Sequence, residues 1–201
     1  MRTLRGPPVK APLALLLAAL AAGCSPAPDK PLVRPQSILV IRHAEKPADA
    51  TAIGLSPEGL KRAKALPELF EMTANRSAPF PTPDFIFATK PSKHSNRPVE
   101  TVAPLAKALK LEVNAGYAND DYPKLADELS TNTKYEGKTV LICWHHGTIS
   151  EFALTLGATG VPDKWKDAVF DRVWVVTFDD KGKAWPLTRR LQGLMPGDAK
   201  E

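Results

Sequence analysis

The stretch Ser37-Ile38-Leu39-Val40-Ile41-Arg42-His43 determines the class of fold that this chain of 201 residues adopts. Its first part is an apolar, β-branched run without polar alternation, which is typical of a strand buried on both faces of a parallel sheet. A second run of this kind, Thr139-Val140-Leu141-Ile142-Cys143-Trp144, ends directly before another histidine. Stretches with helical spacing of apolar residues lie between the two runs. We therefore expect a three-layer α/β sandwich, with a mostly parallel sheet and helices on both faces.

Local signals position the other expected elements. Ser56 is typical of a helix N-cap, and Pro57 follows it in the first turn. Pro98 opens another helix and places Arg97 at its N-cap. The remaining strands are expected at residues 84–88, 111–113, 173–178 and 183–187, and the remaining helices at 122–129 and after Gly147. Residues 179–182 indicate a hairpin turn between the last two strands.

The composition is that of an ordinary globular protein. Hydrophobic residues make up 43% of the chain and charged residues 24%, which excludes a disordered chain, a collagen-like fibre and a multi-span membrane protein. The net charge of the chain is +5. Arg2, Arg5 and Lys10 fall in the first 23 positions, which hold no Asp or Glu, so the rest of the chain carries a net charge of only +2. Since no arginine-rich run is interleaved with aromatic residues, we expect no binding of nucleic acid.

The first 36 residues are expected to form a targeting signal and a tether. Residues 1–23 combine a basic start with a short apolar run at 13–22, which is typical of a secretory signal peptide, since a membrane span needs about 20 apolar residues. Leu20-Ala21-Ala22-Gly23-Cys24 resembles a bacterial lipobox, which implies that Cys24 is acylated and that the proline-rich residues 24–36 tether the domain. We expect an exported protein, periplasmic or in the cell envelope, that meets a membrane only through this lipid. An ordinary cleaved signal peptide is the alternative.

One domain is expected at residues 37–190, followed by a C-terminal tail at 191–201. If Cys24 carries a lipid, Cys143 has no disulfide partner among the two cysteines of the chain. Cys143 lies in an apolar run, so we expect it to be a small buried hydrophobic residue.

Four histidines follow an expected strand or precede an expected helix. They are His43, His94, His145 and His146. In open α/β sheets, ligands bind at the carboxyl edge where such residues gather. Arg42 lies beside the first histidine, and Arg97 opposes a helix dipole unless an anion lies between them. With the free N–H groups of the helix near Gly147, these side chains predict a pocket for a dianion such as phosphate.

Four motifs follow one another along the domain. They are Arg42-His43-Ala44-Glu45-Lys46, Gly54-Leu55-Ser56-Pro57-Glu58-Gly59, Ser95-Asn96-Arg97 with Thr101, and His146-Gly147. This ordered set resembles the histidine phosphatase superfamily, from about Ile38 to Phe178. The resemblance implies a phosphoglycerate-mutase-like α/β fold and a phosphatase that hydrolyses a phosphomonoester without a metal or other cofactor.

The resemblance also implies a role for each matched residue. His43 would attack phosphorus and form a covalent phosphohistidine. The groups that would hold the phosphoryl oxygens are Arg42, Arg97 and His146. The further residues expected to contact substrate are Lys93, His94, His145 and Gly147. The basic mouth of this pocket favours a small acidic phosphorylated substrate.

A general acid for the leaving group is expected among nearby carboxylates. Asp121 is favoured because the adjacent Asp120 would raise its pKa. The alternative is that both residues cap the helix that starts at Tyr122. Glu151 is a further candidate, and some members of the superfamily lack any acid.

Two other functions use the same residues. A non-catalytic, envelope-anchored module would bind a phosphorylated ligand in this pocket without hydrolysing it. A metal-dependent hydrolase would use His43, Glu45, His145 and His146 as ligands, although the helical His-Glu-x-x-His pattern of many zinc enzymes is absent.

Overall fold

A computed structural model describes residues 33–73 and 77–199 of the chain. Its centre is a six-stranded sheet in the order β3-β2-β4-β1-β5-β6. The strands are β1 (Ser37–Arg42), β2 (Phe85–Ala88), β3 (Val113–Asn114), β4 (Thr139–Trp144), β5 (Arg172–Thr177) and β6 (Thr188–Leu191). Strands β3, β2, β4 and β1 run parallel to one another. Strand β5 is antiparallel to β1, and β6 is antiparallel to β5. The expected mostly parallel α/β sheet is confirmed.

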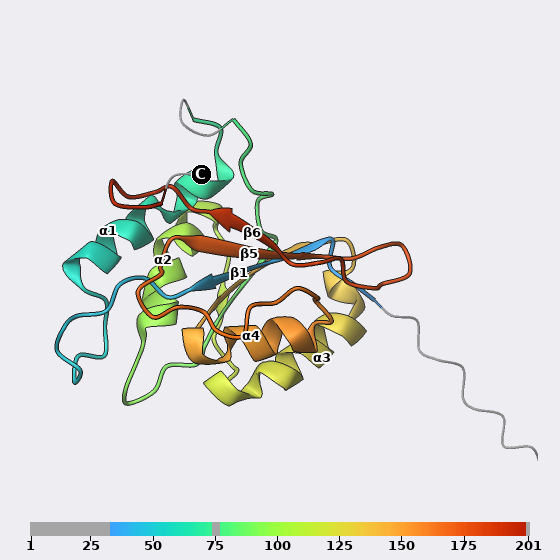
Figure 1. Cartoon of the computed structure of the whole chain (residues 1–201), viewed down its shortest axis with the longest axis horizontal. Helices are drawn as coiled ribbons and strands as arrows, with labels where there is room; N and C mark the ends of the chain where they lie inside the picture. Colours follow the sequence, from blue (N-terminus) through green and yellow to red (C-terminus); the bar gives the residue numbers. More distant parts are fainter. Residues whose placement is uncertain (1–32, 74–76, 200–201) are drawn as a thin grey trace, which may run out of the picture. The chain divides into compact units, whose positions relative to one another are not determined.

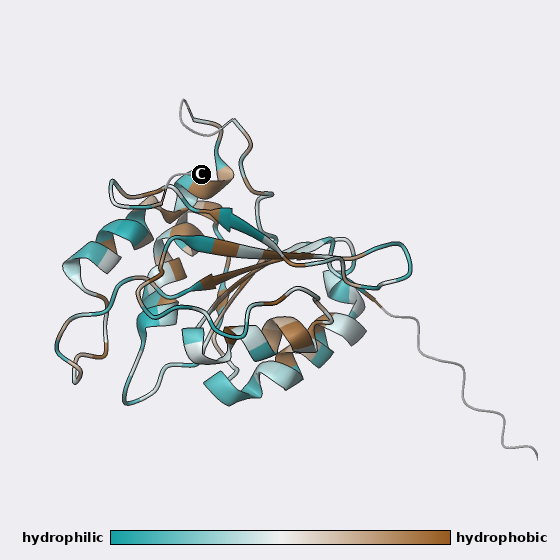
Figure 2. Ribbon diagram, viewed as in Figure 1, coloured by the Kyte–Doolittle hydropathy of each residue, from teal (hydrophilic) through white to brown (hydrophobic). Residues whose placement is uncertain are grey.

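Helices cover both faces of the sheet (Figure 1). The α-helices are α1 (Pro57–Ala65), α2 (Arg97–Leu109), α3 (Tyr122–Thr131) and α4 (His146–Thr155). Short 3-10 helices span Leu66–Phe70, Asn119–Asp121 and Thr133–Tyr135. Helix α2 packs with α1 on one face, and α3 and α4 lie together on the other. Figure 2 shows hydrophobic strands at the centre and polar residues on the outer sides of the helices.

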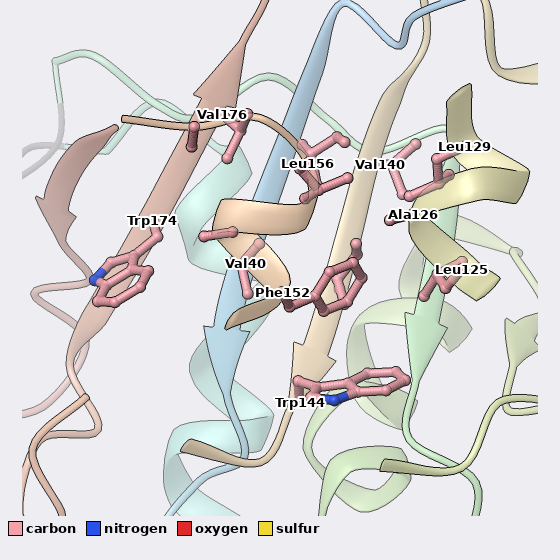
Figure 3. Close-up of a cluster of buried hydrophobic side chains, with 14 of the residues drawn as sticks. Val40, Leu125, Ala126, Leu129, Val140, Trp144, Phe152, Leu156, Trp174 and Val176 are labelled. Atoms are coloured by element: carbon pink, nitrogen blue, oxygen red, sulfur yellow. The ribbon is translucent and has the colours of Figure 1, made fainter. Parts of the chain in front are cut away.

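Each sheet face has its own apolar core. Alternate residues of β1 supply the two cores, since Leu39 and Ile41 pack with α2 whereas Ile38 and Val40 pack with α3 and α4. Figure 3 shows the second core, in which Phe152 of α4 lies over the strands. All six residues of β1 are buried, as predicted for its apolar residues at positions 38–41; Ser37 and Arg42 at its ends are buried as well.

Two helix starts follow from local sequence. The Ser56 side chain accepts a hydrogen bond from the Gly59 N–H at 3.0 Å, so its predicted role as the N-cap of α1 is confirmed. In α2 the N-cap is Asn96 rather than Arg97, which is the first helical residue. The helix therefore starts one residue earlier than expected, and Arg97 has a helical backbone directly before Pro98. The Arg97 N–H donates to the Ser95 hydroxyl at 3.3 Å.

The last strand lies later in the chain than expected. Residues 183–187 make only isolated bridges, Phe178 with Ala184 and Thr159 with Pro186, and the ladder with β5 begins at Thr188. Pro186 has no N–H to donate, which keeps this segment out of the ladder. The predicted turn at residues 179–182 is present, because the Asp179 N–H donates to the Lys183 carbonyl at 2.9 Å.

Residues beyond β6, expected to form a tail, pack against α1 and the segment after β1. Arg62 of α1 is buried and forms ion pairs at 2.7 Å with both Asp198 and Glu45. Gln192 is also buried, and Arg62 donates to its side-chain oxygen at 3.2 Å. The C-terminal residues up to 199 therefore contribute a buried polar cluster to the domain.

The predicted signal peptide, Cys24 and most of the tether lie outside the described residues. Within the described part of the chain, no helix has the length and apolar character needed to cross a membrane.

Candidate functional site

The site lies where β1 and β4 end side by side. The two strands are parallel neighbours, with Arg42 opposite Trp144, so the residues that follow them leave the sheet at the same edge. The His43 N–H donates to the Trp144 carbonyl at 3.1 Å, which extends the ladder by one bond. This edge carries His43 from one strand and His145 from the other.

The His43 side chain is buried and held in one tautomer. Only 2% of the residue is exposed, and its Nδ1 lies 2.7 Å from the Ala44 carbonyl oxygen. A carbonyl can only accept, so Nδ1 carries the proton and Nε2 is left with a free lone pair. The Ala44 N–H donates to the Thr101 hydroxyl at 2.9 Å, and that hydroxyl donates to the Arg97 carbonyl at 2.8 Å. Thr101 therefore ties the loop after β1 to the first turn of α2.

The structure places His145, rather than the expected His146, against His43. The His43 and His145 ring centroids are 5.3 Å apart, with the rings at 68° to each other. His145 is the extended N-cap residue of α4, and His146 is its first helical residue. The change of backbone direction between them turns His146 to Asp167, whose carboxylate lies 3.1 Å from the His146 Nε2.

Two arginines bring unsatisfied donors to this edge. Arg42 is 1% exposed, lies over the Phe170 ring at 4.0 Å, and donates from Nη1 to the carbonyls of Lys166 and Val169 at 3.4 Å each. Its Nε and Nη2 are buried without a hydrogen-bond partner, as is the Nε of Arg97. Buried guanidinium N–H groups are costly to leave unpaired, so their presence indicates a place for an anion.

The charges at the site act on one another. Burial, followed by the nearby Arg42, His145 and Arg97, lowers the pKa of His43 to about 3, although the Ala44 hydrogen bond acts in the opposite direction. Burial, with Arg97, His146 and Arg42, lowers the pKa of His145 to about 4. Burial also lowers the pKa of Arg42 to about 10, which leaves this arginine charged at neutral pH. Both histidines are therefore neutral at pH 7 beside two cations, which suits a nucleophilic imidazole and a bound dianion.

The geometry of Asp121 does not fit the expected general acid. Its carboxylate accepts the Ala118 N–H at 3.0 Å and pairs with Lys124 at 2.6 Å. The Lys124 hydrogen bond and then that of Ala118 lower the Asp121 pKa, so the group is ionised at neutral pH and has no proton to donate. Asp121 occupies the N-cap position of α3, but its side chain caps the preceding 3-10 helix at Asn119–Asp121 through the Ala118 N–H and makes no hydrogen bond to an N–H group of α3.

The other expected residues are exposed. Lys93 and His94 are exposed at the turn that joins Ser92 to Ser95. A Cβ added to Gly147 would have no neighbouring atom within 4 Å, so the space beside the start of α4 is open. Asp120 is exposed and accepts from the Asn119 side chain at 2.9 Å, and Glu151 is exposed on α4. Contact of any of these residues with substrate stays a prediction.

The residues considered as metal ligands are bonded to different partners. Glu45 accepts hydrogen bonds from Arg62 through both carboxylate oxygens. His146 is turned toward Asp167. Among residues 33–73 and 77–199, no three or more His, Cys, Asp or Glu side chains converge in a way that would hold a metal ion.

Sequence reasoning missed the segment before β5, which completes the site. Phe170 packs against both His43, with ring centroids 6.3 Å apart, and Arg42. Carbonyl groups of residues 166–169 hold the Arg42 side chain, and Asp167 adds its carboxylate beside His146. Backbone acceptors in an irregular loop leave no pattern in the sequence, so no signal there marked this segment.

Comparisons with known proteins match the chain at the level of structure. No protein-family model and no curated protein matches the sequence. A structure of the protein histidine phosphatase SixA, complexed with tungstate, is 13% identical with a TM-score of 0.56, over 78% of this chain and 97% of that one. A mycobacterial glucosyl-3-phosphoglycerate phosphatase, in complex with inorganic phosphate, is 12% identical with a TM-score of 0.50, over 78% of this chain and 96% of that one. The phosphoglycerate-mutase-like fold that the sequence motifs implied is therefore confirmed.

Proposed function

We propose that this protein is a phosphatase of the histidine phosphatase superfamily, which hydrolyses a phosphomonoester through a covalent phosphohistidine on His43. The observation that carries the proposal is the position of a neutral, buried imidazole beside buried arginine N–H groups that have no partner. The fold shared with two phosphatases supports it.

In the first step, the lone pair on Nε2 of His43 attacks phosphorus. A P–N bond forms while the bond between phosphorus and the leaving-group oxygen breaks, and that oxygen leaves with the electron pair. Water then attacks the phosphohistidine, the P–N bond breaks, and inorganic phosphate is released with the imidazole restored. The Nδ1–H donated to Ala44 keeps Nε2 directed at the substrate throughout.

The residues around His43 stabilise the transferring phosphoryl group. The free N–H groups of Arg42 and Arg97 would bind its oxygens, a preorganised arrangement that stabilises the charge of the transition state. We assign the second histidine of the pair to His145, because it contacts His43 whereas His146 is bonded to Asp167.

The kind of leaving group that the site favours follows from the same geometry. Since the Asp121 carboxylate is ionised and bonded to the Ala118 N–H and to Lys124, it would not donate a proton to the leaving group. Substrates whose leaving group departs readily, such as aryl phosphates, should react fastest. Lys93 and His94 would favour a small acidic substrate, and a lipid on Cys24 would hold the exported protein at the cell envelope.

Steady-state hydrolysis of 4-nitrophenyl phosphate, with EDTA present, tests the proposal. The wild type should turn over, His43→Ala should lose at least a thousandfold in kcat, and His145→Ala should lose far more than His146→Ala. The control variant is Lys107→Ala, an exposed residue in the last turn of α2 that is expected to change kcat less than threefold. Full activity in His43→Ala would falsify the mechanism. Stoichiometric phosphate binding without turnover would point to a non-catalytic binding module, and loss of activity in EDTA to a metal-dependent hydrolase.

A further inference from the structure

A small pocket is lined in part by the segment that holds Arg42. It has a volume of about 250 Å³ and lies between residues 162–169 and the strands β5 and β6. This volume is below the 300–1,000 Å³ of typical ligand pockets, so it suits a ligand of one or two rings. The His43 and Arg97 side chains are not part of its lining.

The floor of the pocket is aromatic. Trp165 and Trp174 lie with ring centroids 4.9 Å apart at 37°, and each is less than 5% exposed. Figure 3 shows Trp174 on β5, at the margin of the apolar core. The Trp165 indole N–H donates to the Val169 carbonyl at 2.7 Å, which fixes its ring plane. Because Trp165 is 4% and Trp174 3% exposed, a planar ring in the pocket would contact the small accessible part of these indoles, through dispersion.

The rim of the pocket is positively charged. Four cationic side chains line it, and none of the described lining residues is acidic. They are Lys164, Lys166, Arg172 and Arg189. Arg172 is paired with its neighbour Asp171. Arg189 lies opposite Trp174 in the ladder between β5 and β6, which places this charge beside the aromatic floor.

We propose that this pocket binds a small aromatic anion, with the ring on the tryptophans and a carboxylate or sulfonate on the cationic rim. An aromatic body with an anionic end satisfies both features at once, whereas a neutral ring would leave the rim without a counter-charge. The binding site is separate from the reaction centre.

The Val169 carbonyl group connects the pocket to the reaction centre. The Val169 oxygen accepts from the Trp165 indole and also from Nη1 of Arg42, at 3.4 Å. A ligand on Trp165 and an anion on Arg42 would both restrict the segment that carries this carbonyl group. The first ligand to bind would bear most of the entropy cost of this restriction, so the second would bind more tightly. The two ligands should therefore bind cooperatively; this consequence rests on the proposed function, whereas the binding of the aromatic anion does not.

Titration of the full protein with 2-naphthoate tests the site, with 2-naphthamide as the neutral probe of the same shape. Calorimetry in saturating inorganic phosphate should show one site for 2-naphthoate and at least tenfold weaker binding of 2-naphthamide. The indole N–H signal of Trp165, identified by its loss in Trp165→Phe, should shift in nitrogen-15 NMR spectra. Equal affinity for the two probes, or displacement of 2-naphthoate by phosphate, overturns the proposal.

Neighbouring arginines on β6 give a matched pair of variants. Arg189→Gln should weaken 2-naphthoate binding by up to about fivefold, the range of one exposed charge contact. Arg190→Gln should leave it unchanged, because Arg190 lies over Phe80 at 4.0 Å and donates to the Ala78 carbonyl. Equal effects of the two variants overturn the site. Saturating 2-naphthoate should also lower the phosphate Kd at least twofold; an unchanged Kd overturns the coupling alone, and no phosphate binding at all contradicts the proposed function instead.

Discussion

The buried neutral histidines should make the protein less stable in mild acid. His43 and His145 have pKa values of about 3 and about 4 in the folded state, against an ordinary value of 6.5. As the pH falls below 6.5, the unfolded chain binds protons that the native state does not, so the free energy of unfolding falls until the folded pKa is reached. Above pH 7 neither histidine contributes.

The size of this effect follows from the two pKa values. At pH 5, about 1.5 pH units below the ordinary value, each histidine lowers the free energy of unfolding by ~2 kcal/mol relative to pH 7, and the pair by ~4 kcal/mol. Carboxylates and other groups add their own pH dependence. A comparison with the double variant His43→Asn/His145→Asn removes these other contributions, because they are common to both proteins.

Urea denaturation at pH 7 and pH 5, in buffer without phosphate, measures the difference. The wild type should lose ~4 kcal/mol more between the two pH values than the double variant does. The control variant His94→Asn, which changes an exposed histidine, should behave as the wild type. If wild type and double variant fall by the same amount, within ~0.5 kcal/mol, the two histidines are not buried in neutral form and the electrostatic account of the site is wrong.

Three further predictions concern other residues. Arg97→Lys keeps the charge but loses the planar guanidinium group. The kcat/KM for an aryl phosphate should therefore fall about 10- to 100-fold, with little change in melting temperature. An unaffected kcat/KM would show that Arg97 is not part of the phosphate site. Asp121→Asn should change kcat less than twofold in the same assay, since the carboxylate is bonded to the Ala118 N–H and to Lys124. A large loss with poor leaving groups would restore it as the acid. Arg62→Met removes the cation that pairs with both Glu45 and Asp198 and should lower the free energy of unfolding by about 3–5 kcal/mol in urea. Lys61→Met, at an exposed neighbour, should change it by less than ~0.5 kcal/mol. Equal effects of Arg62→Met and Lys61→Met would contradict the buried ion cluster.

The central strands could be predicted because burial on both faces leaves a strong pattern. In β1 and β4 every residue is buried, and all of them except Ser37, Arg42 and Thr139 at the strand ends are apolar. The edge strand β6, Thr188–Leu191, was missed because its four residues are polar or half-exposed and include two arginines. An edge strand needs little apolar surface, so its position depends on the ladder with β5 rather than on its own composition.

The candidate site could be predicted as a set of residue types, but not in its detailed assignment. The strand ends bring Arg42 and His43 to one edge with the second histidine pair, as the parallel order requires. Which histidine faces His43 depends on where the strand ends and α4 begins, and this boundary passes between His145 and His146. Asp121 as the general acid stays a prediction for a similar reason, because a capping residue and a proton donor are of the same type at the same place, and here the carboxylate is bonded to the Ala118 N–H and to Lys124.

Trapping of the phosphoenzyme tests the central claim most directly. The protein is mixed with an aryl phosphate, quenched within milliseconds at alkaline pH, where phosphohistidine survives, and digested for mass spectrometry. We predict one phosphoryl group on the peptide that contains His43, in the wild type and in His146→Ala, and none in His43→Ala. Rapid turnover with no phosphopeptide, or a phosphoryl group on another residue, would contradict the account.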